Sequence, residues 1–313
     1  MTAYLAGRIL ALIPVLLVVG AVVFGLTRFT PGDPVRVLLG EDARPEQVQA
    51  LRRHLGLDRP LVVQFGLWVA RAVRGDLGVS YFNRLPVRWI IAQHLGPTVM
   101  LALLAITVAL CIGIPVGVVS ALFRNSWLDQ ASLALALLGA AVPSFWLGLS
   151  LIVVFAVGLG WLPSSGFKPL TEGLWPSVRH LLLPALALGL PNSALIIRFV
   201  RSSLLDVISA DYVRTARAKG LAERVVIFRH ALRNALVPIL TVVGLTFAAL
   251  MGGAVVTETV FAIPGIGQLV VSSVLRRDYP VIQGVTLVVT TSYVMINLVV
   301  DLLYLAVDPR VKY

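Results

Sequence analysis

Cysteine and charged residues are both scarce in this chain of 313 amino acids. A single cysteine, Cys111, excludes a disulfide scaffold. Only 13% of the residues are charged, against roughly 25% in an average soluble domain. In contrast, 58% are hydrophobic and the mean hydropathy is +0.92. These figures exclude a soluble globule and a disordered chain, and they predict a membrane protein. Cys111 lies in an apolar run, where we expect it to fill space.

Long apolar runs without fixed charge identify the candidate membrane-spanning helices, because a helix needs about 20 apolar residues to cross the bilayer core. Six such runs occur, at about Ile9–Leu26, Leu95–Phe123, Ala131–Trp161, Leu181–Ile197, Leu236–Phe261 and Val281–Val307. The fourth is short and contains Pro184 and Pro191, which are expected to bend it. The first could be a secretory signal, but it is long for a signal core and no small-residue cleavage pattern follows it. We therefore interpret it as a retained helix.

Lysine and arginine are unevenly distributed over the segments between these runs. With the amino terminus inside, the inner segments carry Arg8, Arg124, eight basic residues from Arg198 to Arg233, Arg310 and Lys312. The short outer loops carry Lys168, Arg179, Arg276 and Arg277. The positive-inside rule then predicts that both termini are cytoplasmic. The net charge of +11 is mostly a topology signal, so nucleic-acid binding is not expected.

The outer segment between the first two runs, residues 30–94, contains two amphipathic patterns. Apolar residues follow helical spacing from Pro45 to Leu55, and Gly56 is placed to end that helix. A second helix is expected after Asp58 and Pro60, as a cap and first-turn pair. Its apolar side consists of Leu61, Phe65, Trp68, Val69 and Ala72. Two roles are open for these helices: packing on the membrane surface, or a collar that meets a delivering partner.

The inner segment between the fourth and fifth runs carries most of the inner charge and reads DYVRTARAKGLAERVVIFRHALRNALVP. Gly220 interrupts two helical patterns, from about Leu204 to Ala218 and from about Ala222 to Leu236, which predicts a helix, a tight turn and a second helix. An apolar stripe on the second helix consists of Val225, Phe228, Leu232 and Leu236. Val226 and Ile227 add apolar surface on another side. A helix that is apolar on several sides needs several neighbours, here the chain's own bundle and a cytoplasmic protein. The alternative is a basic loop on anionic lipid head groups.

The common catalytic and metal-binding patterns are missing from the sequence. It contains no P-loop and no HExxH pattern, and the four histidines, His54, His94, His180 and His230, lie in different segments. Ser150 lacks the flanking glycines of a nucleophile elbow and is expected to bond its own helix backbone. Gly265 and Gly267 are expected to shape a loop. We therefore expect a chain that is not an enzyme and binds no cofactor or metal.

Ionisable residues inside apolar runs are functional suspects in a membrane, and two carboxyl groups qualify. Glu258 lies near the outer end of the fifth run and Asp301 late in the sixth, so we expect anchoring at the interface or packing. Arg198 and Arg201 lie three residues apart at a helix end and do not form a voltage sensor. No carboxylate lies clearly at mid-membrane, as it would in an ion-coupled carrier.

The inner segment Asp211–Pro238 resembles the cytoplasmic coupling loop of bacterial ABC importer permeases. Other motifs resemble the first permease in the class that imports dipeptides, oligopeptides, glutathione or nickel. These motifs are TPGDP at Thr30–Pro34, LGLDRPL at Leu55–Leu61, GDLGVS at Gly75–Ser80, TETVFAIPGIG at Thr257–Gly267, RDYPVIQG at Arg277–Gly284 and VDLLYLAVDPRVKY at Val300–Tyr313. The resemblance therefore extends over nearly the whole chain.

The coupling loop departs from the broader family pattern of Glu-Ala-Ala, three residues, Gly, nine residues and Ile-x-Leu-Pro. With Gly220 as the glycine, the first positions fall on residues 214–216, which are Arg-Thr-Ala, so the glutamate is absent. The last positions run from His230 to Arg233, so the proline is absent too. These departures look like the peptide subgroup's own pattern, and they put in doubt any contact that a family glutamate would make.

The resemblance implies an all-α membrane protein with the six-helix fold of type I ABC importer permeases and an extra outer amphipathic segment. It implies a transmembrane helix at 1–29, an outer segment at 30–94, a permease core at 95–307 with a coupling loop at 206–235, and a tail at 308–313. It also implies a second, homologous permease, two cytoplasmic ABC ATPases that hold ATP and Mg, and an extracytoplasmic substrate-binding protein. The residues implied to couple to the ATPases are Asp211, Tyr212, Arg214, Thr215, Ala216, Arg217, Ala218, Lys219, Gly220, Leu221, His230 and Arg233.

The expected cargo is a dipeptide or oligopeptide, with glutathione close behind and nickel third. A secondary transporter that works alone and depends on an ion gradient is the main rival to the ATP-driven importer. Dependence of uptake on ATP and on a binding protein separates the two.

Overall fold

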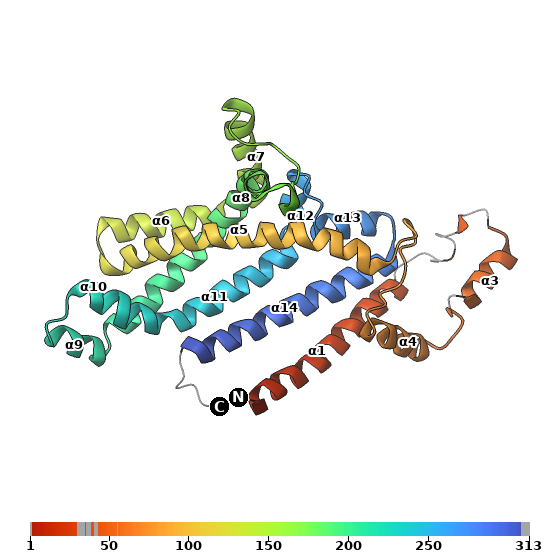
Figure 1. Ribbon diagram of the computed structural model, residues 1–313, viewed down its shortest axis with the longest axis horizontal. Helices are drawn as coiled ribbons and strands as arrows, with labels where there is room; N and C mark the ends of the chain where they lie inside the picture. Colours follow the sequence, from red (N-terminus) through yellow and green to blue (C-terminus); the bar gives the residue numbers. More distant parts are fainter. Residues whose placement is uncertain (1, 30–34, 36–38, 41–42, 55, 308–313) are drawn as a thin grey trace. The chain divides into compact units, whose positions relative to one another are not determined.

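The computed structural model describes residues 2–29, 35, 39–40, 43–54 and 56–307, and most of these residues are helical (Figure 1). Within them, strand-like pairing is limited to an isolated antiparallel bridge between Val79 and Pro86. The chain divides into two compact units. The first comprises Met1–Gly96 and Gly265–Val294, and the second comprises Pro97–Pro264 and Met295–Tyr313. The TPGDP motif at Thr30–Pro34 lies outside the described residues.

The first unit contains the long amino-terminal helix and the outer segment. Its helices are α1 (Thr2–Phe29), α3 (Pro45–His54), α4 (Leu61–Val73), the start of α5 (Val87–Leu122), α13 (Ile266–Leu275) and the start of α14 (Tyr279–Val307). Its buried cluster joins Val87, Ile90 and Ile91 of α5, Ile266 and Leu269 of α13, and Val281 and Val285 of α14. Helix α13 was not predicted, because its apolar residues follow directly on the Pro-Gly turn, which the sequence assigned to a loop.

The two amphipathic helices of the outer segment are confirmed, with corrections at their ends. Helix α3 ends at His54, and Gly56 follows it with a φ of +66°. Helix α4 packs on α1 through Phe65 and Trp68, whose rings lie 5.5 and 6.1 Å from that of Phe24. The predicted cap is wrong, because Pro60 itself occupies the capping position and no side chain caps the helix.

The inner face of α4 also differs from the prediction at two positions. Leu61 is exposed, and the polar Gln64 is buried. Gln64 Nε2 donates hydrogen bonds to the carbonyl oxygens of Leu57 and Arg59, and these bonds compensate its amide nitrogen for the loss of water. A hydrophobic pattern could not identify this position, because the partners of Gln64 are backbone groups.

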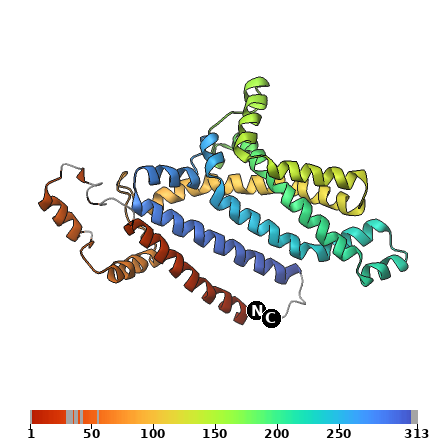
Figure 2. The ribbon, with the colours of Figure 1, turned by 180° about the vertical axis from the view of Figure 1, so that it is seen from behind.

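The second unit is built around one long helix, α8 (Leu174–Ile208). Helices α6 (Trp127–Ala141), α7 (Ser144–Leu151) and α11 (Leu232–Gly253) all contact α8. The remaining elements are the rest of α5, η1 (Ile152–Gly158), η2 (Leu170–Glu172), α9 (Asp211–Ala218), α10 (Glu223–Val225), η3 (Val226–Ala231), α12 (Val255–Val260) and the end of α14. In both ribbon views α6 runs back beside the end of α5 (Figures 1 and 2).

Helices α5 and α8 approach each other closely at glycines. A Cβ at Gly117 of α5 would lie 2.7 Å from the Cβ of Val200, and one at Gly189 of α8 would lie 2.7 Å from the carbonyl oxygen of Ala105. Real side chains essentially never come this close. Small residues at such positions let membrane helices gain close backbone packing, so this part of the unit is tightly joined.

Three helices of the described residues are long and apolar enough to cross a membrane: Val87–Leu122, Leu174–Ile208 and Tyr279–Leu303. The number rises to five if two bent pairs each form one span. The prediction of six spans remains a prediction. The fourth run is longer than predicted, because α8 continues unbroken through Pro184 and Pro191.

The third and fifth runs are not single straight helices. The third bends by 95° between α6 and the helical stretch Ser144–Gly158. Val142 and Pro143 separate the two parts in extended conformation, as expected where a proline disfavours helix in the residue before it. The fifth run is interrupted at Ala254, and α12 follows as a separate short helix.

Individual side chains confirm some predictions and correct others. Ser150 Oγ donates to the carbonyl oxygen of Trp146 at 2.9 Å, as predicted. Glu258 is fully buried and accepts a hydrogen bond from Thr98 Oγ1 at 2.6 Å, so it packs inside the unit and does not anchor at an interface. Cys111 is exposed on α5 and does not fill an internal space of this chain. Gly267 lies inside α13 and not in a loop.

Candidate functional site

The candidate site is the connecting segment, residues 206–235, which joins α8 to α11. The predicted helix from Leu204 to Ala218 is broken at its middle. Helix α8 ends at Ile208, and the Ser209 hydroxyl donates to the carbonyl oxygen of Asp206 at 2.8 Å. Ala210 is extended (φ −72°, ψ 147°), and α9 begins at Asp211. Serine weakly disfavours a helix interior, but Ala210 favours one and neither glycine nor proline is present, so local propensity does not predict this break.

Helix α9 ends in a turn that depends on Gly220. The φ of Gly220 is +76°, and the amide of Gly220 donates a hydrogen bond to the carbonyl oxygen of Arg217 at 2.9 Å. The amide of Leu221 donates to the carbonyl oxygen of Ala216 at 3.4 Å. This pair of bonds is a Schellman motif, in which a left-handed residue closes the helix. The space around a Cβ at this position is open, so glycine is required by conformation and not by packing.

The chain returns through α10 and η3 and continues into α11 without leaving helical conformation. Residues Val226–Ala231 form a π-helix, a form that is rare and often occurs at functional positions. Val226, Ile227 and Ala231 are buried. The second helix of the prediction is therefore confirmed in extent, but its middle is wound more widely than an α-helix.

One face of the connecting segment is held against its own unit. Val213 and Ala216 of α9 form a buried cluster with Val226, and Val207 of α8 packs against it. Asn234 Nδ2 donates to the Tyr212 hydroxyl at 2.9 Å and so joins α9 to α11. These contacts fix α9 relative to both long helices.

An exposed ion pair between Arg217 and Glu223 bridges the turn at Gly220. Arg217 Nη2 lies 2.6 Å from Glu223 Oε1, and Arg217 Nε lies 3.2 Å from both carboxylate oxygens. The hydrogen bonds from Arg217 lower the pKa of Glu223 below its usual value, and those same bonds raise the pKa of Arg217. The charge of Arg217 is therefore largely compensated within this chain, so its contribution to a partner contact is reduced.

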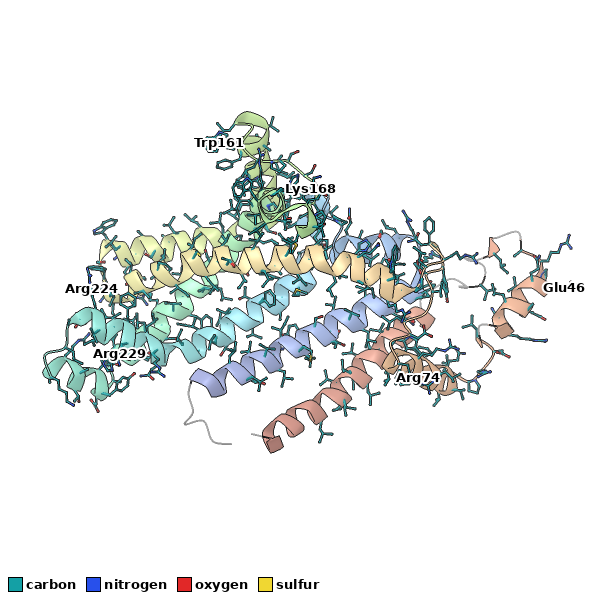
Figure 3. The ribbon with its side chains drawn as sticks, in the orientation of Figure 1. Glu46, Arg74, Trp161, Lys168, Arg224 and Arg229 are labelled. Carbon is teal, nitrogen blue, oxygen red and sulfur yellow. The ribbon has the colours of Figure 1, made fainter. Side chains whose placement is uncertain are left out.

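The opposite face of the segment is exposed and combines apolar with basic side chains. Its large exposed apolar residues are Tyr212, Leu221, Val225 and Phe228, and Phe228 is 60% exposed. Its exposed basic residues are Arg214, Arg217, Lys219, Arg224, Arg229 and Arg233. Figure 3 shows Arg224 and Arg229 on this part of the chain. An apolar surface ringed by charge is typical of a protein interface.

The structure brings the predicted coupling residues together on one short segment, but not all of them face outward. Those with exposed side chains or backbone are Asp211, Tyr212, Arg214, Thr215, Arg217, Ala218, Lys219, Gly220, Leu221 and Arg233. Ala216 is buried, and His230 is half-buried. The prediction missed Val225 and Phe228 as exposed residues. Their 3.6-residue stripe was visible, but the sequence could not show which stripe faces the bundle.

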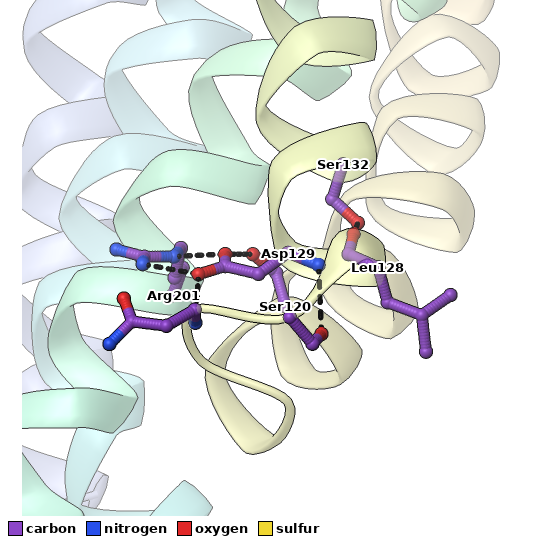
Figure 4. Close-up of polar contacts among 7 residues, drawn as sticks. Ser120, Leu128, Asp129, Ser132 and Arg201 are labelled. Carbon is purple, nitrogen blue, oxygen red and sulfur yellow. Dashed lines mark hydrogen bonds and ion pairs between the residues drawn. The ribbon is translucent and has the colours of Figure 1, made fainter.

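A second polar cluster lies at the turn between α5 and α6 (Figure 4). The buried carboxylate of Asp129 accepts hydrogen bonds from Arg201 Nε at 2.7 Å and Arg201 Nη2 at 2.8 Å. It also accepts from Ser120 Oγ at 2.6 Å and from the Asn125 amide at 2.9 Å. Sequence reasoning missed this cluster because no local spacing connects Asp129 with Arg201.

Apolar helices of membrane-spanning length, joined by a basic segment with an exposed apolar face, define a multi-pass membrane protein. Its fold is similar to that of a solved transporter. An inward-facing structure of the MetNI methionine ABC transporter matches with a TM-score of 0.59 and 21% identity, over 70% of this chain and 97% of that chain.

The chain belongs to the family described as binding-protein-dependent transport system inner membrane component, which matches residues 113–313. Residues 1–102 match the family's amino-terminal region, described as binding-protein-dependent transport system membrane component, N-terminal. A putative peptide transport system permease protein of Brucella abortus is 46% identical over 313 residues and covers 100% of both chains.

Two further relatives carry more specific names. The dipeptide transport system permease protein DppB of Alkalihalophilus pseudofirmus is 44% identical, with 100% of both chains covered. The glutathione transport system permease protein GsiC of Escherichia coli O6:H1 is 44% identical, with 99% of both covered. These relatives match along their whole length, and the family resemblance predicted from the sequence motifs is confirmed.

Proposed function

We propose that this chain is the transmembrane permease subunit of an ATP-driven importer of peptides, and that its connecting segment docks on cytoplasmic ATPases. The observation that carries the docking is the division of this segment into two faces. One face is fixed to α8 and α11 by the Val213 cluster and Asn234, and the other exposes Phe228 among arginines. A fixed segment with an exposed apolar face can receive a mechanical stroke and pass it on.

In the proposed mechanism, the chain itself carries out no chemistry. Two ATPases hold ATP and Mg, a second, homologous permease forms the other half of the pathway, and an extracytoplasmic binding protein delivers the cargo. Both termini and the connecting segment lie in the cytoplasm. When the ATPases close on ATP, they displace α9, and its contacts carry that displacement to α8 and α11. The two permeases then rock between outward and inward opening.

The proposed cargo is a peptide. The relatives described above are named for peptides, dipeptides and glutathione, which is itself a tripeptide. These names favour a peptide backbone as the shared chemistry and do not favour nickel. A peptide carries an amino group, a carboxyl group and amide groups, so its recognition needs hydrogen-bonding partners and not a cluster of metal ligands.

The docking proposal is tested by Phe228→Asp, measured as the amount of ATPase that co-purifies with the chain. Burying a carboxylate at the centre of an interface reduces the binding free energy by more than the truncation of a typical hot-spot residue does. We therefore expect the amount of associated ATPase to fall by about tenfold or more. Phe82→Asp is the matched control, because Phe82 is also 60% exposed but lies in the first unit. Its ATPase association should remain at the wild-type level.

The same preparation separates docking on protein from docking on lipid. If the segment only touches anionic head groups, Phe228→Asp will co-purify with ATPase as well as the wild type does and will instead bind less to anionic vesicles. That result would contradict the docking proposal. Uptake that continues without ATP and follows an ion gradient would support the rival secondary transporter.

A further inference from the structure

We infer that Asp129 and Arg201 form a positioning joint that makes the turn between α5 and α6 move together with α8 and the connecting segment. This inference rests on the proposed function, because it assigns the pair a part in transmitting the stroke. Neither residue belongs to the connecting segment, and neither is placed in contact with cargo or ATPase.

The bonding of Asp129 is the first observation. Its carboxylate accepts hydrogen bonds from Ser120 of α5, from the backbone of Asn125 in the turn, and from both Nε and Nη2 of Arg201 in α8. A single buried side chain thus joins three parts of the chain, and Arg201 lies 72 residues from Asp129 in sequence. Figure 4 shows the guanidinium of Arg201 facing this carboxylate. No oxygen of Asp129 is left without a donor.

The position of Arg201 along α8 is the second observation. Seven residues separate it from Ile208 at the end of α8, a distance of about 10 Å along a helix. Helix α9 begins three residues beyond that end, at Asp211. A displacement that enters at α9 therefore reaches the joint within the last two turns of α8. The joint lies at the level where Val200 packs on Gly117 of α5, well before the middle of α8.

The chemistry of the pair is the third observation. Apolar surfaces along α6 and α8 meet through Ala136, Ala194 and Ile197, and hydrophobic contact is by itself non-directional. A bidentate guanidinium and carboxylate pair fixes both direction and register, and a lysine cannot reproduce this geometry. Buried ion pairs are poor sources of stability but can specify register, which is the property that a transmission joint needs.

Arg201→Lys is the informative variant because it keeps the charge but removes the bidentate geometry. Arg198→Lys is its matched control, one turn earlier on α8 and exposed. Spin labels are attached to cysteines that replace Arg124 at the α5–α6 turn and Ser209 between α8 and α9, in a chain with Cys111→Ser so that no other thiol of this chain reacts. The distance between the labels is measured in the reconstituted complex, with and without ATP and vanadate.

In the wild type and in Arg198→Lys we expect the distance to stay the same in both nucleotide states, because the turn follows α9. In Arg201→Lys we expect the distribution to broaden and to shift with nucleotide. In this variant the number of ATP molecules hydrolysed per molecule imported should rise by about 2- to 30-fold. The imported probe is dialanine or glutathione, whichever of the two the wild type imports. A residue with only a structural role would lower hydrolysis and import together and leave this ratio unchanged.

Two outcomes would overturn the joint. One is a wild-type distance that changes with nucleotide, and the other is an Arg201→Lys variant with wild-type distances and an unchanged ratio. Failure of the proposed function would look different, since the complex with ATPases would not form. In that case the distance between the labels would be measured in the purified chain alone, for the wild type and for Arg201→Lys. Equally narrow distance distributions in the two would contradict the inference.

Discussion

Two ion pairs of arginine and carboxylate in the described part of the chain have similar contact distances but different surroundings. Arg201 and Asp129 lie 2.7 Å apart, and their side chains are 21% and 3% exposed. Arg217 and Glu223 lie 2.6 Å apart, and theirs are 38% and 55% exposed. The residues of the first pair are 72 positions apart in sequence and join two helices. The residues of the second pair are six positions apart and close a turn. The comparison teaches that burial and sequence separation, and not contact distance, decide what an ion pair does.

The physical reason is the cost of removing charge from water. A buried partner that loses its counter-charge remains uncompensated, whereas an exposed partner is solvated again at once. Three predictions sharpen this contrast between the buried pair, the turn and the exposed pair.

The largest effect is expected for Asp129→Ala. It leaves the guanidinium of Arg201 and the Ser120 hydroxyl without their acceptor, so the free energy of unfolding should fall by about 3–5 kcal/mol. The measurement is unfolding of the purified chain in detergent. Asp211→Ala is the control, because Asp211 is 97% exposed and its pair with Arg214 is 3.7 Å long. Equal losses in the two variants would break the comparison.

An intermediate effect is expected for Gly220→Ala. The positive φ at this position puts a Cβ in a left-handed conformation, which costs roughly 1–2 kcal/mol. Gly66→Ala in α4 is the control, because a Cβ is equally free of contacts there but φ is not positive. That control should keep or gain stability, since alanine favours helix over glycine. If both variants lose the same stability in detergent unfolding, the turn does not depend on the conformation of Gly220.

The smallest effect is expected for Glu223→Gln, which removes the exposed pair. A surface ion pair contributes about 0–1 kcal/mol and is screened by salt. Because Arg217 lowers the pKa of Glu223 from its ordinary value of 4.5, the contribution is present above that pH. It is lost as the pH falls through the lower, folded-state pKa. Unfolding of wild type and Glu223→Gln should therefore converge in acid and in high salt. A difference that persists in acid would mean that the side chain acts through packing.

The sequence could predict the features that depend on local patterns. Apolar runs located the long helices, spacing located α3 and α4, and Gly220 located the turn of the connecting segment. Each of these signals lies within a window of about a helical turn or a span, where periodicity and glycine act directly.

The remaining features depend on contacts that are distant in sequence. The buried state of Glu258 with Thr98 and the Asp129 cluster each require knowledge of which helix lies opposite. The bend after Ala141 is different, because Pro143 gives it a local signal that the prediction did not use. Within the candidate site, the stripe at Val225 and Phe228 was visible in the sequence, but only the packing of Val226 against α9 shows that the stripe faces outward.

The central claim is that the exposed face of the connecting segment contacts a cytoplasmic ATPase. Cross-linking tests it most directly, because Cys111 is the only cysteine and Cys111→Ser gives a cysteine-free chain. Phe228→Cys in that background should form a cross-link to the ATPase inside intact cells, and a membrane-impermeant maleimide added outside should not label it. Labelling from outside, or a cross-link to lipid without any to the ATPase in the assembled complex, would contradict the account.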